Sequence, residues 1–334
     1  MTANYNPRAE PPAQPADGRV EHRLEVPGAL AGARLDQALA QLLAQHSRSR
    51  LQAWIAAGQV RVDGTVVVST RHRLHGGETL TVTEAAPAID DRVAAQPIPL
   101  AVVHEDAALI VVDKPAGLVV HPGSGNRDGT LQNALLHHAP ALATVARAGI
   151  VHRLDKDTSG LMVVAKTPEA HVDLVRQLAA RTVRREYAAL VHGDLARATT
   201  VDAPIGRHPT QRTTMAVVAS GRPARTHVDV VERFGVATLV RCRLDTGRTH
   251  QSRVHLAALG HPLVGDPTYG TRRRAATALP AEARAFRRQA LHAQRLGLVH
   301  PVTRAPMQWD SALPADFAAL LAALRAAAAA GKPR

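Results

Sequence analysis

The densest set of side chains that could do chemistry lies in residues 149–160, where the sequence reads Gly-Ile-Val-His-Arg-Leu-Asp-Lys-Asp-Thr-Ser-Gly. Its ionisable residues are His152, Arg153, Asp155, Lys156 and Asp157. Apolar runs flank this polar segment, and a polar loop between strands is where a rigid scaffold presents catalytic groups. Taken alone, the segment is equally compatible with a charged surface loop.

A glycoside hydrolase is one enzyme class that this segment could serve. Asp155 and Asp157 supply the pair of carboxylates that glycoside hydrolysis uses. In an extended chain, however, a spacing of two residues places both side chains on the same face. Aromatic residues make up only 2% of the chain, and none accompanies this pair to bind a sugar.

Two further stretches hold candidate functional groups. In residues 244–255 a strand runs through a glycine turn into a helix, and His250 and Arg253 share one helical face. Arg253 could reach an anion in a cleft, although a solvated helix-surface arginine is the more common case. The second stretch, residues 184–187, brings Tyr187 to the start of a strand, where a plain core or edge aromatic is the alternative.

The elements around these stretches predict an α+β domain over residues 100–334. Helices are expected over 168–180, with Thr167 as the N-cap, and over 249–259, ended by Gly260. Alternating apolar residues predict short strands at 101–103, 109–112, 161–165, 187–191, 228–231 and 238–244. Because helices and strands do not alternate regularly, a parallel doubly wound sheet is disfavoured. Neither a Gly-x-Gly-x-x-Gly nor a Gly-x-x-x-x-Gly-Lys motif occurs, so no nucleotide cofactor is indicated.

A smaller module is predicted over residues 20–84. Apolar residues at helical spacing predict one helix near 35–43, and Ser47 can cap a second helix that carries Leu51, Trp54 and Ile55. Asp63-Gly64 is a hairpin turn between alternating strands. Arginines at the second helix and near the hairpin could bind phosphate, or could simply solvate the surface. These arginines are Arg48, Arg50, Arg71 and Arg73.

The composition limits the partners and the compartment. A formal net charge of +13, carried mostly by arginine, favours a polyanionic partner such as RNA, DNA or an acidic membrane. The single cysteine, Cys242, cannot form an internal disulfide and is expected in the core. The histidines show no ligand-type spacing, so no metal site is expected.

The remaining segments predict a cytoplasmic protein. Residues 1–19 are rich in proline and lack an apolar segment, which predicts a disordered tail and no secretory signal. No apolar run reaches the length of a membrane span, and the alanine-rich stretch Phe317 to Ala330 is expected to be a surface helix. A linker is expected over residues 85–99.

The small module resembles the alpha-L RNA-binding motif. Arg34-Leu35-Asp36 opens the first helix, residues 47–50 read Ser-Arg-Ser-Arg at the second, and Ile55, Gly58 and Gly64 follow in the same order. The resemblance implies that the module binds RNA, and it makes RNA contact the preferred interpretation of its arginines.

The larger domain resembles the RluA/RluD family of pseudouridine synthases. Residues 152–160 match the family signature His-Arg-Leu-Asp-x-x-Thr-Ser-Gly in full. Matching segments follow the family order from about residue 20 to 315. They include residues 113–118, 121–123, 247–251, 260–263, 265–270 and 289–293. This chain departs from the family at Ser252, where an aliphatic residue is usual, and at Asp113, where asparagine is common.

The resemblance implies roles for individual residues. Asp155 is the catalytic nucleophile, Arg253 pairs with it, and Tyr187 lies against the base and moves a proton at the end of the reaction. Arg153 would fill the gap left by a flipped-out base. Further substrate contacts are expected from His152, Arg248, His250 and Gln251. The reaction is an isomerisation, so neither a cofactor nor a metal ion is expected. The implied fold is a central mixed, mostly antiparallel sheet.

The target is expected to be structured RNA, with large-subunit (23S) ribosomal RNA the best match because the small module is present. Three alternatives stay open at this point. They are a family member that acts on transfer RNA or another ribosomal helix, a non-catalytic RNA-binding assembly factor, and an RNA or nucleoside glycosidase. We expect a monomer without a membrane partner. The motifs do not specify which uridines are modified.

Overall fold

The computed structural model describes residues 20–43, 46, 48–84, 93–123, 126–211, 213–270 and 279–330, with Arg48, Ser49 and Glu282 described by backbone alone. The chain divides into two compact units, Met1–Arg92 and Val93–Arg334. The predicted tail over residues 1–19, the Ser47 cap and residues 85–92 of the predicted linker lie outside the described residues.

The first unit is a small sheet packed against two helices. The sheet has the order β1-β4-β2-β3. Its elements are β1 (Val20–Glu25), α1 (Leu35–Leu42), α2 (Arg48–Ala56), β2 (Val60–Val62), β3 (Thr65–Val66) and β4 (Thr79–Glu84). Leu51, Trp54 and Ile55 of α2 are buried, as their spacing predicts. Asp63 and Gly64 both adopt positive φ between β2 and β3, which a two-residue hairpin turn requires.

The second unit is built on one large mixed sheet with the order β5-β6-β7-β14-β8-β13-β12-β9, and β15 pairs with β14 beside this path. Its strands are β5 (Val102–Glu105), β6 (Leu109–Lys114), β7 (Ser159–Ala165), β8 (Arg184–His192), β9 (Thr199–Asp202), β12 (Arg225–Arg233), β13 (Ala237–Leu244), β14 (Leu291–Val299) and β15 (Pro306–Asp310). A separate hairpin joins β10 (Ile205–Arg207) to β11 (Met215–Val217). Among these pairings within the described residues, β7 with β14 is parallel and the others are antiparallel.

The parallel junction depends on Gly160, at the end of the 152–160 signature. Gly160 has φ +114°, and a Cβ there would lie 2.3–2.7 Å from the backbone of Ala293 on β14. No other residue type fits this backbone contact, since both the conformation and the space exclude a side chain. The close approach fixes the strand that follows the loop carrying Asp155.

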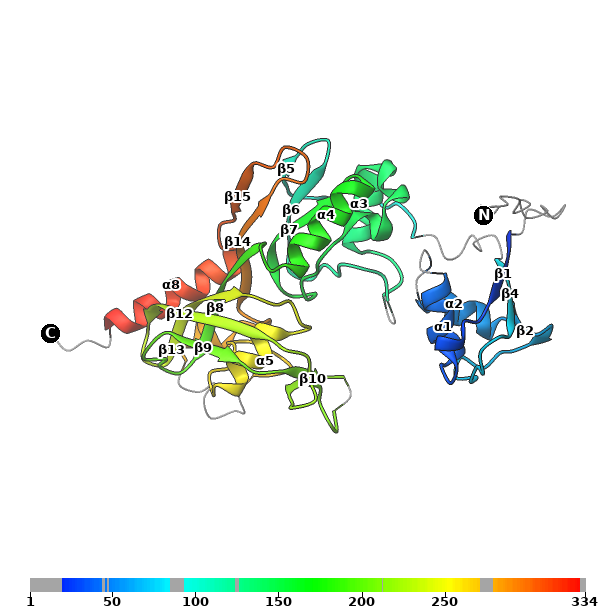
Figure 1. Ribbon diagram of the computed structural model, residues 1–334. Helices are drawn as coiled ribbons and strands as arrows, with labels where there is room; N and C mark the ends of the chain where they lie inside the picture. Colours follow the sequence, from blue (N-terminus) through cyan, green and yellow to red (C-terminus); the bar gives the residue numbers. More distant parts are fainter. Residues whose placement is uncertain are drawn as a thin grey trace, which may run out of the picture. The chain divides into compact units, whose positions relative to one another are not determined.

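The α-helices described in the second unit are α3 (Leu131–His138), α4 (Pro168–Ala179), α5 (Gln251–Ala258), α7 (Ala281–Arg284) and α8 (Ala315–Ala330). Of these, α4, α5 and α8 begin and end close to where the sequence predicts, whereas α3 and α7 were not predicted. Thr167 caps α4, accepting a hydrogen bond from the Ala170 amide. Figure 1 shows α3 and α4 near β6 and β7, and α8 alongside the opposite end of the sheet.

Helix α8 is more than a surface helix. Four of its apolar residues are buried against β8 and β13, among them Phe317, which has no exposed surface. Most alanines of α8 are exposed, which is the pattern expected of a helix lying on a sheet.

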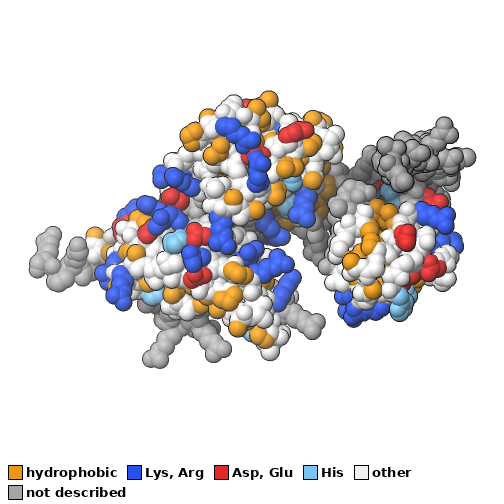
Figure 2. Space-filling model, in the orientation of Figure 1, with side chains coloured by type: hydrophobic (Ala, Val, Ile, Leu, Met, Phe, Trp, Pro, Cys, Tyr) orange, Lys and Arg blue, Asp and Glu red, His pale blue; other side chains and the backbone are white. Residues whose placement is uncertain are grey.

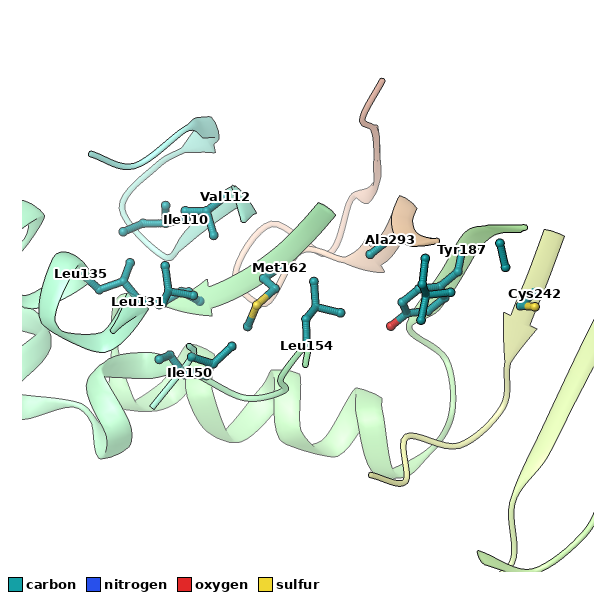
Figure 3. Close-up of a cluster of buried hydrophobic side chains, with 14 of the residues drawn as sticks. Ile110, Val112, Leu131, Leu135, Ile150, Leu154, Met162, Tyr187, Cys242 and Ala293 are labelled. Carbon is teal, nitrogen blue, oxygen red and sulfur yellow. The ribbon is translucent and has the colours of Figure 1, made fainter. Parts of the chain in front are cut away.

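The main core lies on the sheet face that carries Tyr187. It joins Val112, Met162 and Leu154 to Tyr187, Cys242 and their neighbours, and Figure 3 shows these side chains along the strands and the loop that carry them. Cys242 is fully buried, as predicted for a small core residue. Among the described residues, no helix combines the length and the apolar character needed to cross a membrane.

Candidate active site

A cavity of about 410 Å³ in the second unit brings the three predicted catalytic residues together. Asp155 comes from the loop before β7, Tyr187 from β8 and Arg253 from α5. All the substrate-binding residues expected from the sequence also line this cavity. These are His152, Arg153, Arg248, His250 and Gln251. Segments about 100 residues apart therefore meet at one site, with Arg253 lying 98 residues beyond Asp155.

Arg253 bridges two carboxylates. Its Nη1 donates to Asp155 Oδ2 at 3.0 Å, while Nε and Nη2 donate to Asp266 Oδ2 at 2.7 Å and Oδ1 at 2.8 Å. Asp266 has no exposed side-chain surface, whereas the side chain of Asp155 keeps 19% of its exposure. The buried fork with Asp266 fixes the guanidinium, and the guanidinium in turn fixes the direction of the more accessible Asp155 carboxylate.

The charged groups of Asp155, Arg253 and Asp266 stabilise one another's ionised forms. Burial alone would lower the pKa of Arg253, but its hydrogen bonds and charge interactions with Asp266 and Asp155 raise it above the usual value. Burial acts to raise the pKa of Asp266, and the Arg253 contacts outweigh that effect and lower it. The amides of Thr268 and Tyr269 also donate to Asp266 Oδ1. Asp266 is therefore held as a carboxylate.

His250 approaches the other oxygen of Asp155. It adopts a left-handed backbone, φ 57°, at the start of α5, and its Nε2 lies 3.7 Å from Asp155 Oδ1. The Met215 amide donates to the Tyr269 hydroxyl oxygen, and that hydroxyl lies 2.9 Å from His250 Nδ1. A Tyr269 hydroxyl that donates to Nδ1 would place the imidazole proton on Nε2, facing Asp155. Burial lowers the pKa of His250, which favours this neutral form.

Tyr187 forms a wall of the cavity and is 7% exposed. Figure 3 shows its ring on β8 with the hydroxyl directed toward the loop that carries Leu154, the residue before Asp155. Burial raises the pKa of Tyr187, an effect that the positive charge of Arg185 opposes and the negative charge of Asp155 reinforces. The phenol is thus kept protonated.

The residues expected to contact substrate differ in how much hydrogen-bonding capacity they retain. Arg153 is exposed at the cavity, and Arg248 is half-buried with Nε bonded to the Pro223 carbonyl. His152 Nε2 accepts the Val163 amide at 3.0 Å, and burial lowers its pKa to about 3. Its imidazole is therefore neutral and connects the loop that carries Asp155 to β7.

Gln251 is buried, and both ends of its amide are already bonded within the protein. Its Oε1 accepts from the Thr246 hydroxyl and the Arg248 amide, while Nε2 donates to the Arg225 carbonyl and the Thr226 hydroxyl. Such a side chain joins the turn before α5 to β12 and orients the helix that carries Arg253.

The two departures from the family pattern lie close to functional segments. Ser252 is buried in α5 and lines the cavity between Gln251 and Arg253. Asp113 on β6 accepts a hydrogen bond from the hydroxyl of Ser311, the residue after β15. Asp113 thus has a partner of its own within the fold.

In the first unit the predicted RNA-contacting arginines are partly described. Arg71 and Arg73 are exposed, with Arg73 bonded to the Gly32 carbonyl, and Arg50 pairs with Glu84 and stacks over Trp54. The side chain of Arg48 lies outside the described residues. In the second unit, Figure 2 shows many Lys and Arg side chains on the visible face.

One group of three possible metal ligands occurs among the described residues: His22, His46 and Glu84 of the first unit, whose ligand atoms lie within 4.8 Å of one another. His22 Nε2 is 3.1 Å from Glu84 Oε2. The spacing of these residues along the chain follows no ligand motif, so the sequence did not reveal this group.

Reasoning from sequence also missed other polar groups that contact the site residues or lie near them. Asp266 and Tyr269 lie in the segment 265–270 that resembles the family, but the sequence predicted no role for them. An aspartate followed by Pro-Thr-Tyr often accepts hydrogen bonds from the amides of the turn that it begins. Lys114 is 1% exposed and donates to the carbonyls of Pro115, Leu118 and Lys156. Burial lowers its pKa to about 8, despite the nearby charges of Asp157 and Asp155. Lys114 follows an apolar strand, and nothing in the sequence indicated that its side chain would be buried.

Comparison with known proteins defines the class. Residues 108–258 match the family model for RNA pseudouridylate synthase, and residues 33–80 match the model for the S4 domain. The chain belongs to the RNA pseudouridine synthases, which isomerise uridine within RNA, and it carries an N-terminal S4 domain. The sequence predictions of the family, the RNA-binding module and the α+β fold are confirmed.

Particular relatives are closely similar. The chain is 57% identical over 302 residues to the ribosomal large subunit pseudouridine synthase D of Nitrosomonas europaea, covering 90% of this chain and 87% of that one. It is 54% identical to the protein of the same name from Pseudomonas aeruginosa, over 92% of this chain and 96% of that one. Among solved structures, human RNA pseudouridylate synthase domain containing 1 aligns with a TM-score of 0.52 at 30% identity, covering 70% of this chain and 97% of that one.

Proposed function

We propose that this enzyme converts uridines of large-subunit (23S) ribosomal RNA to pseudouridine, with Asp155 as the nucleophile and without a cofactor. The target follows from the names of relatives that are 50–57% identical along most of the chain. The observation that carries the catalytic proposal is the Arg253 bridge, which presents the partly exposed carboxylate of Asp155 to the cavity.

The reaction breaks the bond from uracil N1 to ribose C1′ and joins C1′ to C5 of the same base. An ionised carboxylate can attack, or remove a proton, near the sugar. Arg253 favours the charged form of Asp155 and holds its direction. Tyr187 lies against the base and transfers the C5 proton after the new bond has formed. The C5 hydrogen leaves as a proton, N1 gains a proton, and every other atom of the uridine stays in the product, so no oxidant, reductant or activated group is required.

The uridine must leave the RNA stack to enter the cavity. Arg153, exposed at the cavity, would occupy the gap in the RNA. Arg248 and His250 contact the flipped nucleotide, while His152 and Gln251 support the site through their bonds to Val163 and to the turn before α5. Phosphate contacts from the arginines of the S4 domain, Arg48, Arg50, Arg71 and Arg73, offset the cost of unstacking, which is a few kcal/mol. The enzyme acts as a monomer in the cytoplasm.

The glycoside hydrolase alternative, in which Asp155 and Asp157 form the carboxylate pair, is disfavoured by the placement of the second carboxylate. Asp155 lines the cavity, but the neighbouring Asp157 is not among the described residues that form its wall. A two-carboxylate mechanism needs both groups at the scissile bond.

The test compares Asp155→Asn with the matched variant Asp157→Asn on ribosomal RNA lacking pseudouridine. We expect Asp155→Asn to abolish pseudouridine formation while RNA affinity stays within about threefold, which corresponds to less than about 0.7 kcal/mol. Asp157→Asn should retain activity, since its carboxylate lies outside the cavity wall. Near-wild-type activity of Asp155→Asn would refute the nucleophile assignment, and release of free uracil by the wild type would identify a glycosidase.

A further inference from the structure

Arg185 is a buried cation without a visible counter-ion. It is 9% exposed, and its Nε is buried without a hydrogen-bond partner. No ion pair joins its guanidinium to a carboxylate in the described part of the chain. Burying a charge without a partner is costly, so a protein retains such a group only where something else interacts with it.

The position of Arg185 indicates where that partner would lie. Arg185 and Tyr187 are two residues apart on β8, so their side chains stand next to each other on one face of the sheet. Both line the cavity that holds Asp155. The guanidinium also lies against the turn before α5, since a Cβ on Gly247 would come within 2.8 Å of Arg185 Nη1. Its charge adds to the effect of burial in lowering the pKa of His152, and it opposes the rise that burial causes in the pKa of Tyr187; both residues belong to the same cavity wall.

The burial of Arg185 favours the base over the RNA backbone as its ligand. Arg153 also lines the cavity and is exposed, so it is better placed to meet phosphates that remain in solvent. Arg185 stands beside the phenol proposed to lie against the base. The groups of uracil that accept hydrogen bonds from a guanidinium are its carbonyl oxygens, and Arg presents several N–H donors in a fixed plane.

We propose that Arg185 binds a carbonyl oxygen of the target uracil and stabilises the negative charge that the base acquires when its bond to ribose breaks. This inference rests on the proposed function. When the N1–C1′ bond breaks, its electron pair stays on the uracil, and the charge spreads over O2 and O4. The ribose compensates either by bonding to an Asp155 oxygen or by giving a proton to it. The charge is lost when C5 bonds to C1′, as Asp155 releases the ribose or returns the proton to it. The C5 proton then leaves and N1 gains a proton, so the product base is neutral.

A positively charged group next to a developing anion in a water-poor site acts mainly on the transition state. Arg185→Gln should therefore lower kcat by at least 100-fold and change KM by less than threefold. Arg185→Lys, which keeps the charge but not the fork, should retain intermediate activity. The matched control is Arg184→Gln, which makes the same charge change at the exposed neighbour on β8 and should keep wild-type kcat.

Two further measurements separate this role from a structural one. Removing an unpaired buried charge should leave the melting temperature of Arg185→Gln equal to or above that of the wild type. Added guanidinium chloride, at concentrations that leave the wild type folded, should raise the activity of Arg185→Ala at least tenfold. A lower melting temperature together with no rescue would show that Arg185 only supports the fold, and would overturn the proposal.

The kinetic result can also overturn it. A higher KM with unchanged kcat would assign Arg185 to ground-state binding, as for a phosphate contact, and equal losses in Arg184→Gln and Arg185→Gln would indicate a general charge effect. These outcomes leave the proposed function intact as long as the wild type forms pseudouridine and Asp155→Asn does not. A wild type without pseudouridine activity would instead refute the proposed function itself.

Discussion

Replacing Asp266 by asparagine tests whether the Arg253 bridge sets the direction of Asp155. The two Asp266 oxygens accept different numbers of hydrogen bonds. Oδ1 accepts from Arg253 Nη2 and from two backbone amides, whereas Oδ2 accepts from Arg253 Nε alone. An asparagine would keep a carbonyl oxygen in the place of Oδ1. Its amide nitrogen, in the place of Oδ2, could not accept the hydrogen bond from Arg253 Nε. The variant therefore keeps most of the local turn and loses one charge-assisted hydrogen bond together with the charge.

The magnitude follows from those contacts. A hydrogen bond to a charged group contributes about 1.5–3 kcal/mol, and breaking a buried pair costs about 3–5 kcal/mol. We expect a loss of about 2–4 kcal/mol in the free energy of unfolding. If about 1.4–2.8 kcal/mol of this also holds Asp155 in its reactive direction, kcat falls by about 10–100-fold. RNA affinity should change little, because the side chain of Asp266 has no exposed surface and lies behind Arg253.

The assay is single-turnover release of tritium from C5 of uridine in RNA, with RNA affinity and urea unfolding measured on the same samples. Asp229→Asn is the matched control, since Asp229 also pairs with an arginine, Arg243, but both side chains are more than a third exposed. Exposed ion pairs contribute about 0–1 kcal/mol, so Asp229→Asn should change the free energy of unfolding and kcat very little. Full activity of Asp266→Asn, or a loss of RNA binding equal to the loss of activity, would refute the reasoning.

Two further predictions concern pH and salt. The folded pKa of His152 is lowered to about 3, so the folded state binds fewer protons than the unfolded state between about pH 3 and 6.5, and stability falls as pH falls below 6.5. Relative to His152→Gln, the wild type should lose about 2 kcal/mol between pH 7 and pH 5 in urea unfolding, and parallel curves for the two proteins would contradict this. In the S4 domain, the double variant Arg71→Gln/Arg73→Gln should reduce the slope of log affinity against log salt by about 1.4–1.8, whereas Arg325→Gln, whose partner is Glu232, should not. An unchanged slope in the double variant would remove these residues from the RNA contact.

The sequence predicted what depends on local pattern. Thr167 caps α4 because a threonine before Pro168 meets the first amides of the helix, and this needs no tertiary information. The strands β5, β6, β7, β8, β12 and β13 were placed within a few residues because alternating apolar residues record which face is buried. The strands β9, β14 and β15 of the same sheet were not predicted. Asp155, Tyr187 and Arg253 were chosen from their family motifs, and the structure brings them to one cavity.

What the sequence could not predict depends on contacts between distant segments. The sequence does not distinguish Arg184 from Arg185, because they are adjacent residues of the same type. Which of the two is buried depends on the face of β8 that each side chain occupies. The second carboxylate on Arg253 comes from a turn 13 residues further on, and its geometry requires the fold. Gln251 matched the family as a substrate contact, yet its amide is bonded entirely within the protein.

The place of β14 in the sheet has a consequence for synthesis on the ribosome. This strand lies between β7 and β8, and its His292 pairs with Ser159, which is 133 residues earlier in the chain. Strand β7, which follows the loop that carries Asp155, therefore lacks one neighbour until β14 has emerged. Contacts over such separations form late, because loop closure must precede the interactions that stabilise it. A nascent chain can thus display a folded S4 domain well before it can modify any RNA, so that binding competence precedes catalytic competence during translation.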